Sequence, residues 1–180
     1  MNASPVLREI ALAMRKAKLT DVILIGNAGA AVRGADVTTI DFDFMWRNTA
    51  PNRRKLISVA EDLGADLLEA VYSKSDYLKM ERESDHLEVE MLSAISGIRS
   101  FESLRSRSSR IKIDDYEVTV ASLADIIKSK KAAGRPKDLA VMPMLEAAQR
   151  EIEEQAKEEA AREPRRASRG DSGRVRSRRS

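Results

Sequence analysis

The sequence predicts an α+β fold built on a mixed sheet, and three observations lead to that prediction. Short apolar runs bounded by glycine or by polar turns indicate strands, whereas longer amphipathic runs indicate helices. Two strand pairs fall late in the chain as hairpins, without the regular strand–helix–strand alternation of a parallel sheet. A length of 180 residues suits one domain of ordinary size with its own core.

The first elements are a helix, a strand and a shorter helix. Residues 1–19 form an amphipathic helix with scattered charges, unlike the uninterrupted apolar run of a signal peptide. Residues 21–26, "DVILIG", form a short buried strand that ends in glycine. Small residues at 27–34 then form a short helix that ends at Gly34, and a second strand follows within residues 35–46.

A helix and a hairpin occupy the middle of the chain. Residues 51–64 begin with Pro51, keep their apolar positions on one face and end at Gly64, as a helix does. Residues 76–93 alternate between apolar and polar in two halves about a polar turn at 83–85, as a hairpin does.

A short helix, a second hairpin and a capped helix come next. Residues 101–108 predict the short helix, and residues 110–121 predict two strands about a tight Asp-Asp turn. Ser122 caps the following helix because Asp125 lies three residues later, as in a capping box. Gly134 ends that helix.

The C-terminal part divides at its prolines and its charges. Pro136 opens a helical stretch, and Pro143 indicates a kink. We therefore predict a domain over residues 1–145 and a highly charged helix over 146–163. Arginine, serine and glycine dominate residues 164–180 without an apolar repeat, so we predict a disordered tail there.

Composition excludes several classes of protein. With no cysteine there is no disulfide framework, thiolate metal site or thiol nucleophile, which favours a reducing, cytoplasmic location. A metal would need oxygen ligands or the only histidine, His86. Because His86 follows an acidic turn, we expect it to lie on the surface. No apolar run approaches the roughly 20 residues that span a bilayer, so we expect no membrane partner.

The positive charge belongs to the tail. The chain is +3 overall, but Arg162 to Ser180 holds eight arginines against two acidic residues, which leaves about −3 for the rest. Such a tail suits contacts with the phosphates of RNA or DNA. An inert solubilising extension is the alternative.

Two aspartates in "TTIDFDFMW" carry the strongest chemical signal. On a strand, Asp41 and Asp43 point the same way about 6.6 Å apart, while Ile40, Phe42 and Phe44 point into the core. Two carboxylates this close repel, and one takes up a proton unless a cation lies between them. Hard ions such as Mg²⁺ or Mn²⁺ take carboxylate and phosphate oxygens. The alternative is a solvated strand end.

The turn ahead of these aspartates suits a phosphate. The first strand ends at Gly26, and Asn27 opens a helix of small residues whose first backbone N–H groups are unpaired. The alternative is that Gly26, Gly29 and the alanines only allow a helix to pack closely on the sheet.

Two stretches resemble a known family. "LIGNAGAAVRGADVTTIDFDFMW" is similar to the start of a minimal nucleotidyltransferase of the DNA polymerase β superfamily: a strand, a glycine turn, a short helix, then a strand with Asp-x-Asp. "VASLADIIKSKKAAGRPKDLAVMPMLE" resembles the helix and basic loop of that superfamily's AbiEii-type and related toxin-like bacterial members. The resemblance spans residues 20–146 and implies the polymerase β-like nucleotidyltransferase fold.

The resemblance also implies roles for individual residues. Asp41 and Asp43 would be catalytic metal ligands, and Gly26 with Asn27 the phosphate-binding turn. Glu90, in "HLEVEMLSAISG", stands where a third catalytic, metal-binding carboxylate is usual.

Further residues match the pattern of this superfamily, and two positions differ from it. Glu88 shares the face of Glu90 and is the alternative third carboxylate. Asn27 replaces a usual glycine or serine, and Glu90 is one methylene longer than the usual aspartate. The nucleotide-binding positions of the second stretch are matched by Lys130, Arg135, Lys137 and Asp138.

The implied activity is metal-dependent nucleotidyl transfer. A hydroxyl of an RNA or tRNA end, a protein or a small molecule would attack a nucleoside triphosphate, with two Mg²⁺ or Mn²⁺ ions at the carboxylates. A toxin-like role would add a cognate antitoxin as partner. The alternative is a weak or inactive nucleotidyltransferase-fold protein that binds nucleic acid or serves as an antitoxin or scaffold partner.

Overall fold

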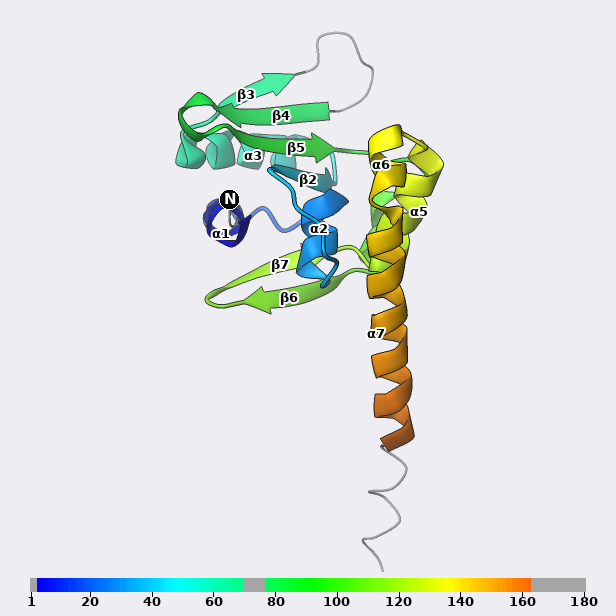
Figure 1. Cartoon of the computed structure of the whole chain (residues 1–180). Helices are drawn as coiled ribbons and strands as arrows, with labels where there is room; N and C mark the ends of the chain where they lie inside the picture. Colours follow the sequence, from blue (N-terminus) through cyan, green and yellow to red (C-terminus); the bar gives the residue numbers. More distant parts are fainter. Residues whose placement is uncertain (1–2, 70–76, 163–180) are drawn as a thin grey trace, which may run out of the picture.

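The computed structural model describes residues 3–69 and 77–162. A seven-stranded mixed sheet forms the centre, with helices on both of its faces (Figure 1). The predicted α+β class with a mixed sheet is confirmed. The predicted disordered tail lies outside the described residues, and the division at residue 145 stays a prediction.

The strands and helices follow one another without a regular repeat. The first part of the chain holds α1 (Ala3–Lys16), β1 (Val22–Leu24), α2 (Gly26–Val32), β2 (Asp41–Trp46), α3 (Ala50–Leu63), β3 (Asp66–Glu69), β4 (Tyr77–Arg82) and β5 (Leu87–Leu92). The second part holds α4 (Phe101–Arg105), β6 (Ser109–Ile113), β7 (Tyr116–Val120), α5 (Leu123–Ala133), α6 (Pro136–Ala140) and α7 (Met142–Arg162).

The order of the strands in the sheet is β3-β4-β5-β2-β1-β7-β6. Strand β2 pairs antiparallel with β1 and parallel with β5, and β1 pairs parallel with β7. The two predicted hairpins, β4–β5 and β6–β7, are confirmed. Their turns are the short 3₁₀ helix Glu83–Asp85 and a turn in which Asp114 takes φ 51°.

Each face of the sheet has its own apolar core. Phe42, Phe44 and Trp46 of β2 belong to the core under α1 and α3. The alternate residue Met45 belongs to the core under α4, α5 and the start of α7. Because side chains alternate along a strand, Asp43 shares the face of Met45.

The helix ends follow the sequence signals. Thr49 caps α3 by accepting a hydrogen bond from the backbone N–H of Asn52 at 3.3 Å, and Gly64 ends it in the left-handed conformation. Ser122 caps α5 by accepting from the N–H of Asp125 at 3.1 Å, and Gly134 ends α5 in the same way. The predicted cap at Ser122 and the predicted ends at Gly64 and Gly134 are confirmed, whereas the cap at Thr49 was not predicted.

Three local expectations were wrong or incomplete. Ile40 does not enter the core: it is 65% exposed, because β2 begins only at Asp41 and Ile40 lies in a bend before it. Pro143 does not kink a helix, because α6 ends before Val141 and the proline is the second residue of the next helix, α7. Strand β3 was not foreseen in the sequence.

No helix in the described part of the chain is long and apolar enough to cross a bilayer.

Two neighbouring residues of α3 test the assignment of the core. Leu56 is fully buried, whereas Ile57 is 46% exposed. Replacing Leu56 with alanine should lower the free energy of unfolding by about 2 to 5 kcal/mol, because it leaves a cavity. Replacing Ile57 with alanine should change it by about 0.5 kcal/mol or less. Urea unfolding followed by circular dichroism measures both, and equal losses would contradict the assignment.

Candidate active site

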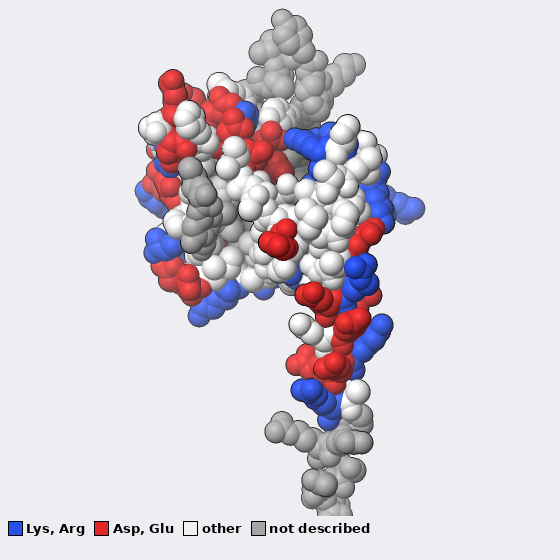
Figure 2. Space-filling view, viewed as in Figure 1, with Lys and Arg blue, Asp and Glu red and all other residues white. Residues whose placement is uncertain are grey.

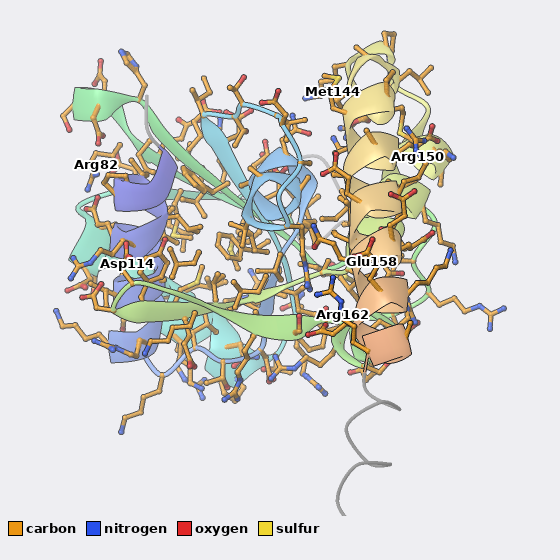
Figure 3. All side chains as sticks on the ribbon, turned by 60° about the horizontal axis from the view of Figure 1, so that its bottom comes forward. Arg82, Asp114, Met144, Arg150, Glu158 and Arg162 are labelled. Atoms are coloured by element: carbon orange, nitrogen blue, oxygen red, sulfur yellow. The ribbon has the colours of Figure 1, made fainter. Side chains whose placement is uncertain are left out.

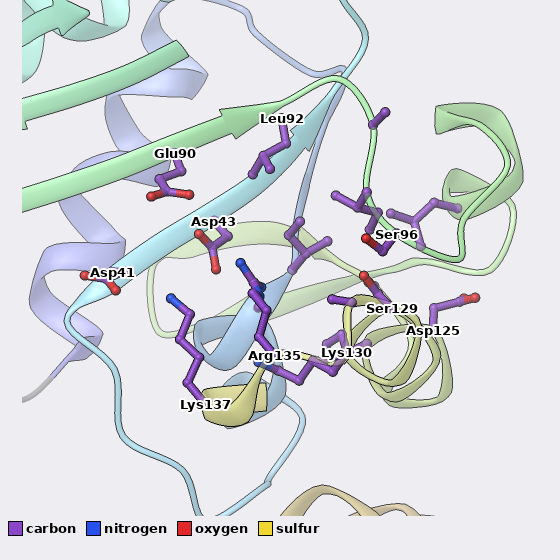
Figure 4. Close-up of a pocket in the computed structure, with 18 residues that line it drawn as sticks. Asp41, Asp43, Glu90, Leu92, Ser96, Asp125, Ser129, Lys130, Arg135 and Lys137 are labelled. Carbon is purple, nitrogen blue, oxygen red and sulfur yellow. The ribbon is translucent and has the colours of Figure 1, made fainter. Parts of the chain in front are cut away.

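Three carboxylates meet at one cleft because β2 and β5 run parallel in a fixed register. Asp43 lies opposite Glu90 in the pairing, and Asp41 lies opposite Glu88. Asp41, Asp43 and Glu90 line the same cleft, whose volume is about 320 Å³. Figure 4 shows them along one wall, projecting from the two neighbouring strands. The structure therefore brings together the three residues that the resemblance named.

The neighbouring strand β4 separates the roles of Glu88 and Glu90. Lys79 of β4 forms ion pairs with Glu81 and, at 3.1 Å, with Glu88. Glu88 is thus neutralised outside the cleft, whereas Glu90 lines it. Burial and the charge of Glu90 raise the pKa of Tyr77 to about 12, which shows how close Glu90 lies to that tyrosine.

Asp43 is the most perturbed of the carboxylates. Burial, then the negative charges of Glu90 and Asp41, raise the pKa of Asp43 from 3.8 to about 6. Lys130 and Lys137 across the cleft act in the opposite direction without cancelling this rise. A positive charge bound nearby would stabilise the ionised form of this carboxylate.

The glycine turn is shaped around Asp43. Gly26 lines the cleft with φ 62°, and a Cβ atom on it would overlap Oδ2 of Asp43 and lie 3.0 Å from its Cγ. Gly29 instead lets α2 pack on β1, since its Cβ would lie 3.1 Å from the carbonyl oxygen of Leu24. The packing interpretation therefore suits Gly29, whereas Gly26 is needed at the carboxylates.

Asn27 lies next to this turn but does not line the cleft. Its amide oxygen is buried, and within the described residues it has no hydrogen-bond partner. Arg33 holds the far end of α2, donating to the backbone oxygens of Ala121 at 2.9 Å and Val120 at 2.8 Å. The short helix is therefore fixed to the end of β7.

A basic wall faces the carboxylates. Lys130 of α5, with Arg135 and Lys137 around the start of α6, lines the cleft. Figure 4 shows these side chains opposite Asp41 and Asp43. In Figure 2 acidic side chains gather on the sheet side of the hollow and basic ones on the α6 side. The cleft is therefore divided into a negative and a positive half.

Asp138 supports the basic wall from behind. It is 1% exposed and is not among the cleft residues. Its carboxylate accepts from Nζ of Lys130 at 2.9 Å and from Nε of Arg135 at 2.6 Å. Burial works against the charge, but the hydrogen bonds from Arg135 and Lys130 outweigh it and lower the pKa of Asp138. Asp138 therefore positions two cations instead of lining the cleft itself.

The other end of the cleft is apolar, and sequence reasoning missed it. Leu92, Ile95 and Ile126 line this end together with the hydroxyl-bearing Ser96 and Ser129. The carboxylate of Asp125 also lines it and is paired with Arg107 at 2.8 Å. Figure 4 shows Leu92, Ser96, Ser129 and Asp125 at this end. Ser129 precedes Lys130 in the second resemblance stretch, which was the only signal for it. Nothing in the sequence marks Ser96, because it lies in a loop whose position depends on the folded chain.

The donor set fits a hard cation by type. Three carboxylates offer the oxygen ligands that Mg²⁺ and Mn²⁺ take. Burial first, and then repulsion by Glu90 and Asp41, raise the pKa of Asp43, and a cation beside it would offset both effects. In the described ranges, however, no three His, Cys, Asp or Glu side chains are already gathered closely enough to hold an ion.

Comparisons with known proteins give a fold and no sequence relative. No protein-family model matches the chain, and no curated protein does. The lincosamide antibiotic adenylyltransferase LnuA, bound to lincomycin, superposes with a TM-score of 0.58 at 16% identity, covering 79% of this chain and 95% of its own. A putative nucleotidyltransferase from Thermotoga maritima reaches 0.57 at 13% identity, covering 77% and 89%.

A third structure has the same arrangement. ANT(2'')-Ia in complex with adenylyl-2''-tobramycin has a TM-score of 0.56 at 17% identity, covering 81% of this chain and 88% of its own. The chain has the nucleotidyltransferase fold. That part of the resemblance is confirmed, whereas none of these structures is described as a toxin, and the AbiEii-type assignment stays a prediction.

The perturbed aspartate predicts a pH-dependent stability. Because folding raises the pKa of Asp43 from 3.8 to about 6, the folded protein holds this proton more tightly than the unfolded chain. Stability therefore falls as pH rises between these values, by about 2 to 3 kcal/mol in all. Asp43→Asn should raise the melting temperature above pH 6 and change it little below pH 4.

Thermal melts across this pH range measure the effect. Asp66→Asn removes one exposed carboxylate from β3 and controls for the change in net charge. Equal shifts in both variants would contradict a buried, repelled Asp43.

Proposed function

We propose that this protein transfers a nucleoside monophosphate from a nucleoside triphosphate to a hydroxyl-bearing acceptor. The observation that carries the proposal is the divided cleft, in which three carboxylates face three cations within one hollow of the nucleotidyltransferase fold. Such a pairing suits a triphosphate, whose negative charge needs cations and whose reacting phosphate needs a coordinated metal.

The chain's own residues divide the work. Lys130, Arg135 and Lys137 bind the triphosphate through charge-assisted hydrogen bonds. Asp41, Asp43 and Glu90 would hold Mg²⁺ or Mn²⁺, which when bound neutralises the charge that develops on the phosphate oxygens. Glycine at position 26 leaves room for the Asp43 carboxylate at the cleft, because a side chain there would overlap it.

The transfer is a displacement at phosphorus. The acceptor oxygen forms a bond to the α-phosphorus, the bond between that phosphorus and the bridging oxygen breaks, and pyrophosphate leaves. Glu90 takes the proton of the attacking hydroxyl, a role for which its longer side chain gives added reach from β5. The apolar end of the cleft, with Ser96 and Ser129, accommodates the nucleobase and ribose.

The neighbours favour a small-molecule acceptor. LnuA is described with lincomycin bound and ANT(2'')-Ia with adenylyl-2''-tobramycin, so in those proteins the acceptors are antibiotics. We infer an acceptor of comparable size for this chain. An RNA or tRNA acceptor, a toxin-like role and an antitoxin partner have no counterpart among those structures.

The carboxylates give the first test. Each of Asp41→Asn, Asp43→Asn and Glu90→Gln should reduce transfer by about 10²-fold or more, a loss typical of removing one preorganised charge. Glu88→Gln is the matched control, because Glu88 lies on the same strand but pairs with Lys79 and should retain activity.

Labelled triphosphates incubated with Mg²⁺ and a library of hydroxyl-bearing small molecules provide the readout. Label that persists unchanged in the three variants would remove the proposal.

Asp138 gives a second test, of positioning. Asp138→Asn removes the anchor of Lys130 and Arg135, so KM for the triphosphate should rise by about tenfold, as loss of a charge-assisted hydrogen bond implies, with a smaller change in kcat. Glu146→Gln releases Lys131, its partner at 2.8 Å outside the cleft, and should leave KM unchanged. Similar KM values for the two variants would show that Asp138 does not position the cations.

A further inference from the structure

A run of basic residues outside the cleft has no part in the proposed reaction. Residues 99–112 hold five cations against the single acidic Glu102, although the chain before Arg162 is net negative. The run starts in the loop before α4, continues through α4 and follows the edge strand β6. Its members are Arg99, Arg105, Arg107, Arg110 and Lys112.

These cations line two grooves. One groove, of about 410 Å³, lies between α1 and the β6–β7 hairpin and is lined by Arg15, Arg105, Arg110 and Lys112 with Asp115 and Glu117. The other, of about 290 Å³, lies between α4 and α5 and is lined by Arg99, Arg107 and Lys128 with Asp125. Arg105 lines the first groove and Arg107 the second, so the two grooves lie on either side of the end of α4. We call this surface the basic band.

Hydrogen bonds fix the centre of the basic band. Arg107 donates from Nε at 2.9 Å and Nη2 at 2.8 Å to the buried carboxylate of Asp125, and from Nη1 to the Ser103 hydroxyl at 3.1 Å. Arg105 donates to the backbone oxygen of Thr20 at 3.0 Å. The band therefore has a rigid middle.

Most acidic residues that line the band are already neutralised by an arginine. Asp115 pairs with Arg8, and Asp125 is neutralised by Arg107. Glu117 alone lies opposite a band cation, Lys112, in the β6–β7 pairing. Five cations remain exposed, with no ion pair inside the described residues, and these are Arg15, Arg99, Arg110, Lys112 and Lys128.

We propose that the basic band binds the phosphodiester backbone of a nucleic acid strand. Successive cations along the loop before α4, the end of α4 and the edge strand β6 match a polymer with a phosphate at every unit. The large apolar side chains exposed in the described part lie elsewhere, on β3, α3, α6, α7 and the bend before β2, which disfavours insertion into a membrane. The band adjoins the triphosphate cleft at α5, where Asp125 lines both hollows, but the cations of the band do not line the cleft.

Helix α7 ends where the arginine-rich part of the sequence begins. Figure 1 shows α7 running past the level of β6 and ending beyond it, and Figure 3 shows Arg162 at that end, with Asp114 at the turn of the β6–β7 hairpin. Eight arginines follow from residue 162 on. Their charge would extend the same electrostatic attraction.

Cations on an edge strand have another use. Lysine and arginine there prevent edge-to-edge pairing of sheets, which would explain Arg110 and Lys112 on β6. It does not explain Arg99 and Lys128, which lie in a loop and on a helix. Protection of the sheet edge therefore concerns Arg110 and Lys112 alone, whereas phosphate binding concerns Arg99 and Lys128 as well. Replacing each pair separately distinguishes these two explanations.

The test uses the full chain and a short, fluorescently labelled single-stranded RNA. Binding is measured by anisotropy over a range of salt concentrations for Arg110→Gln/Lys112→Gln and for Arg99→Gln/Lys128→Gln. Each variant should bind more weakly, and its logarithmic salt slope should be shallower by about 1.4, at about 0.7 per lost phosphate contact. The control Arg54→Gln/Lys55→Gln removes two charges from α3, away from the band, and should keep the wild-type slope.

Matched variants and competitors decide the outcome. Arg110→Lys/Lys112→Arg keeps the charges and should keep the binding, which excludes an effect of misfolding. Slopes equal to the control's in both band variants would overturn the proposal and leave any binding to the C-terminal arginines. Competition by polyglutamate or by anionic lipid vesicles as strong as by unlabelled RNA would also overturn it, because the band would then recognise negative charge alone.

Discussion

The parallel pairing of β2 with β5 is the constraint on which the site depends. It holds Asp43 beside Glu90 on a face where Asp43 cannot retreat into solvent, because Gly26 and the backbone of Ile25 close over it. Ile25 donates its N–H to the carbonyl oxygen of Asp43 at 2.9 Å, which fixes that residue at its backbone. The repulsion between the carboxylates is therefore a consequence of the strand register, and Lys130 and Lys137 offset only part of it.

The opposite wall is rigid for a related reason. Lys130 and Arg135 are long side chains that lose conformational freedom when they bind a phosphate. A buried carboxylate, Asp138, already holds both, so part of this loss occurs on folding and not on binding. The two walls come from distant parts of the sequence, and each is stabilised by contacts made within its own part.

Local signals in the sequence predicted most of the fold and some of the residues that line the candidate site. The Asp-x-Asp alternation, the glycine turn and the cap at Ser122 depend on neighbours in the chain, and the structure follows them. The choice between Glu88 and Glu90 depended on Lys79, which lies on another strand. No spacing in the sequence shows that pairing.

Longer-range features were out of reach for the same reason. Asp138 matched a nucleotide-binding position by resemblance, but only the fold shows that it is buried behind Lys130. The apolar end of the cleft requires a loop to pack on α5, where a Cβ on Gly97 would lie 2.8 Å from the Cβ of Ala132. The misplaced Ile40 shows the converse, since alternation continues in the sequence beyond the point where strand pairing stops.

Paramagnetic broadening by Mn²⁺ in the presence of a non-hydrolysable nucleoside triphosphate tests the central claim most directly. Amide resonances around Asp41, Asp43 and Glu90 should broaden first, because a metal held with the triphosphate lies at those carboxylates. The exposed second half of α7 is rich in glutamate and serves as an internal comparison within the same spectrum. Broadening that begins on α7, or that spares β2 and β5, would contradict the account.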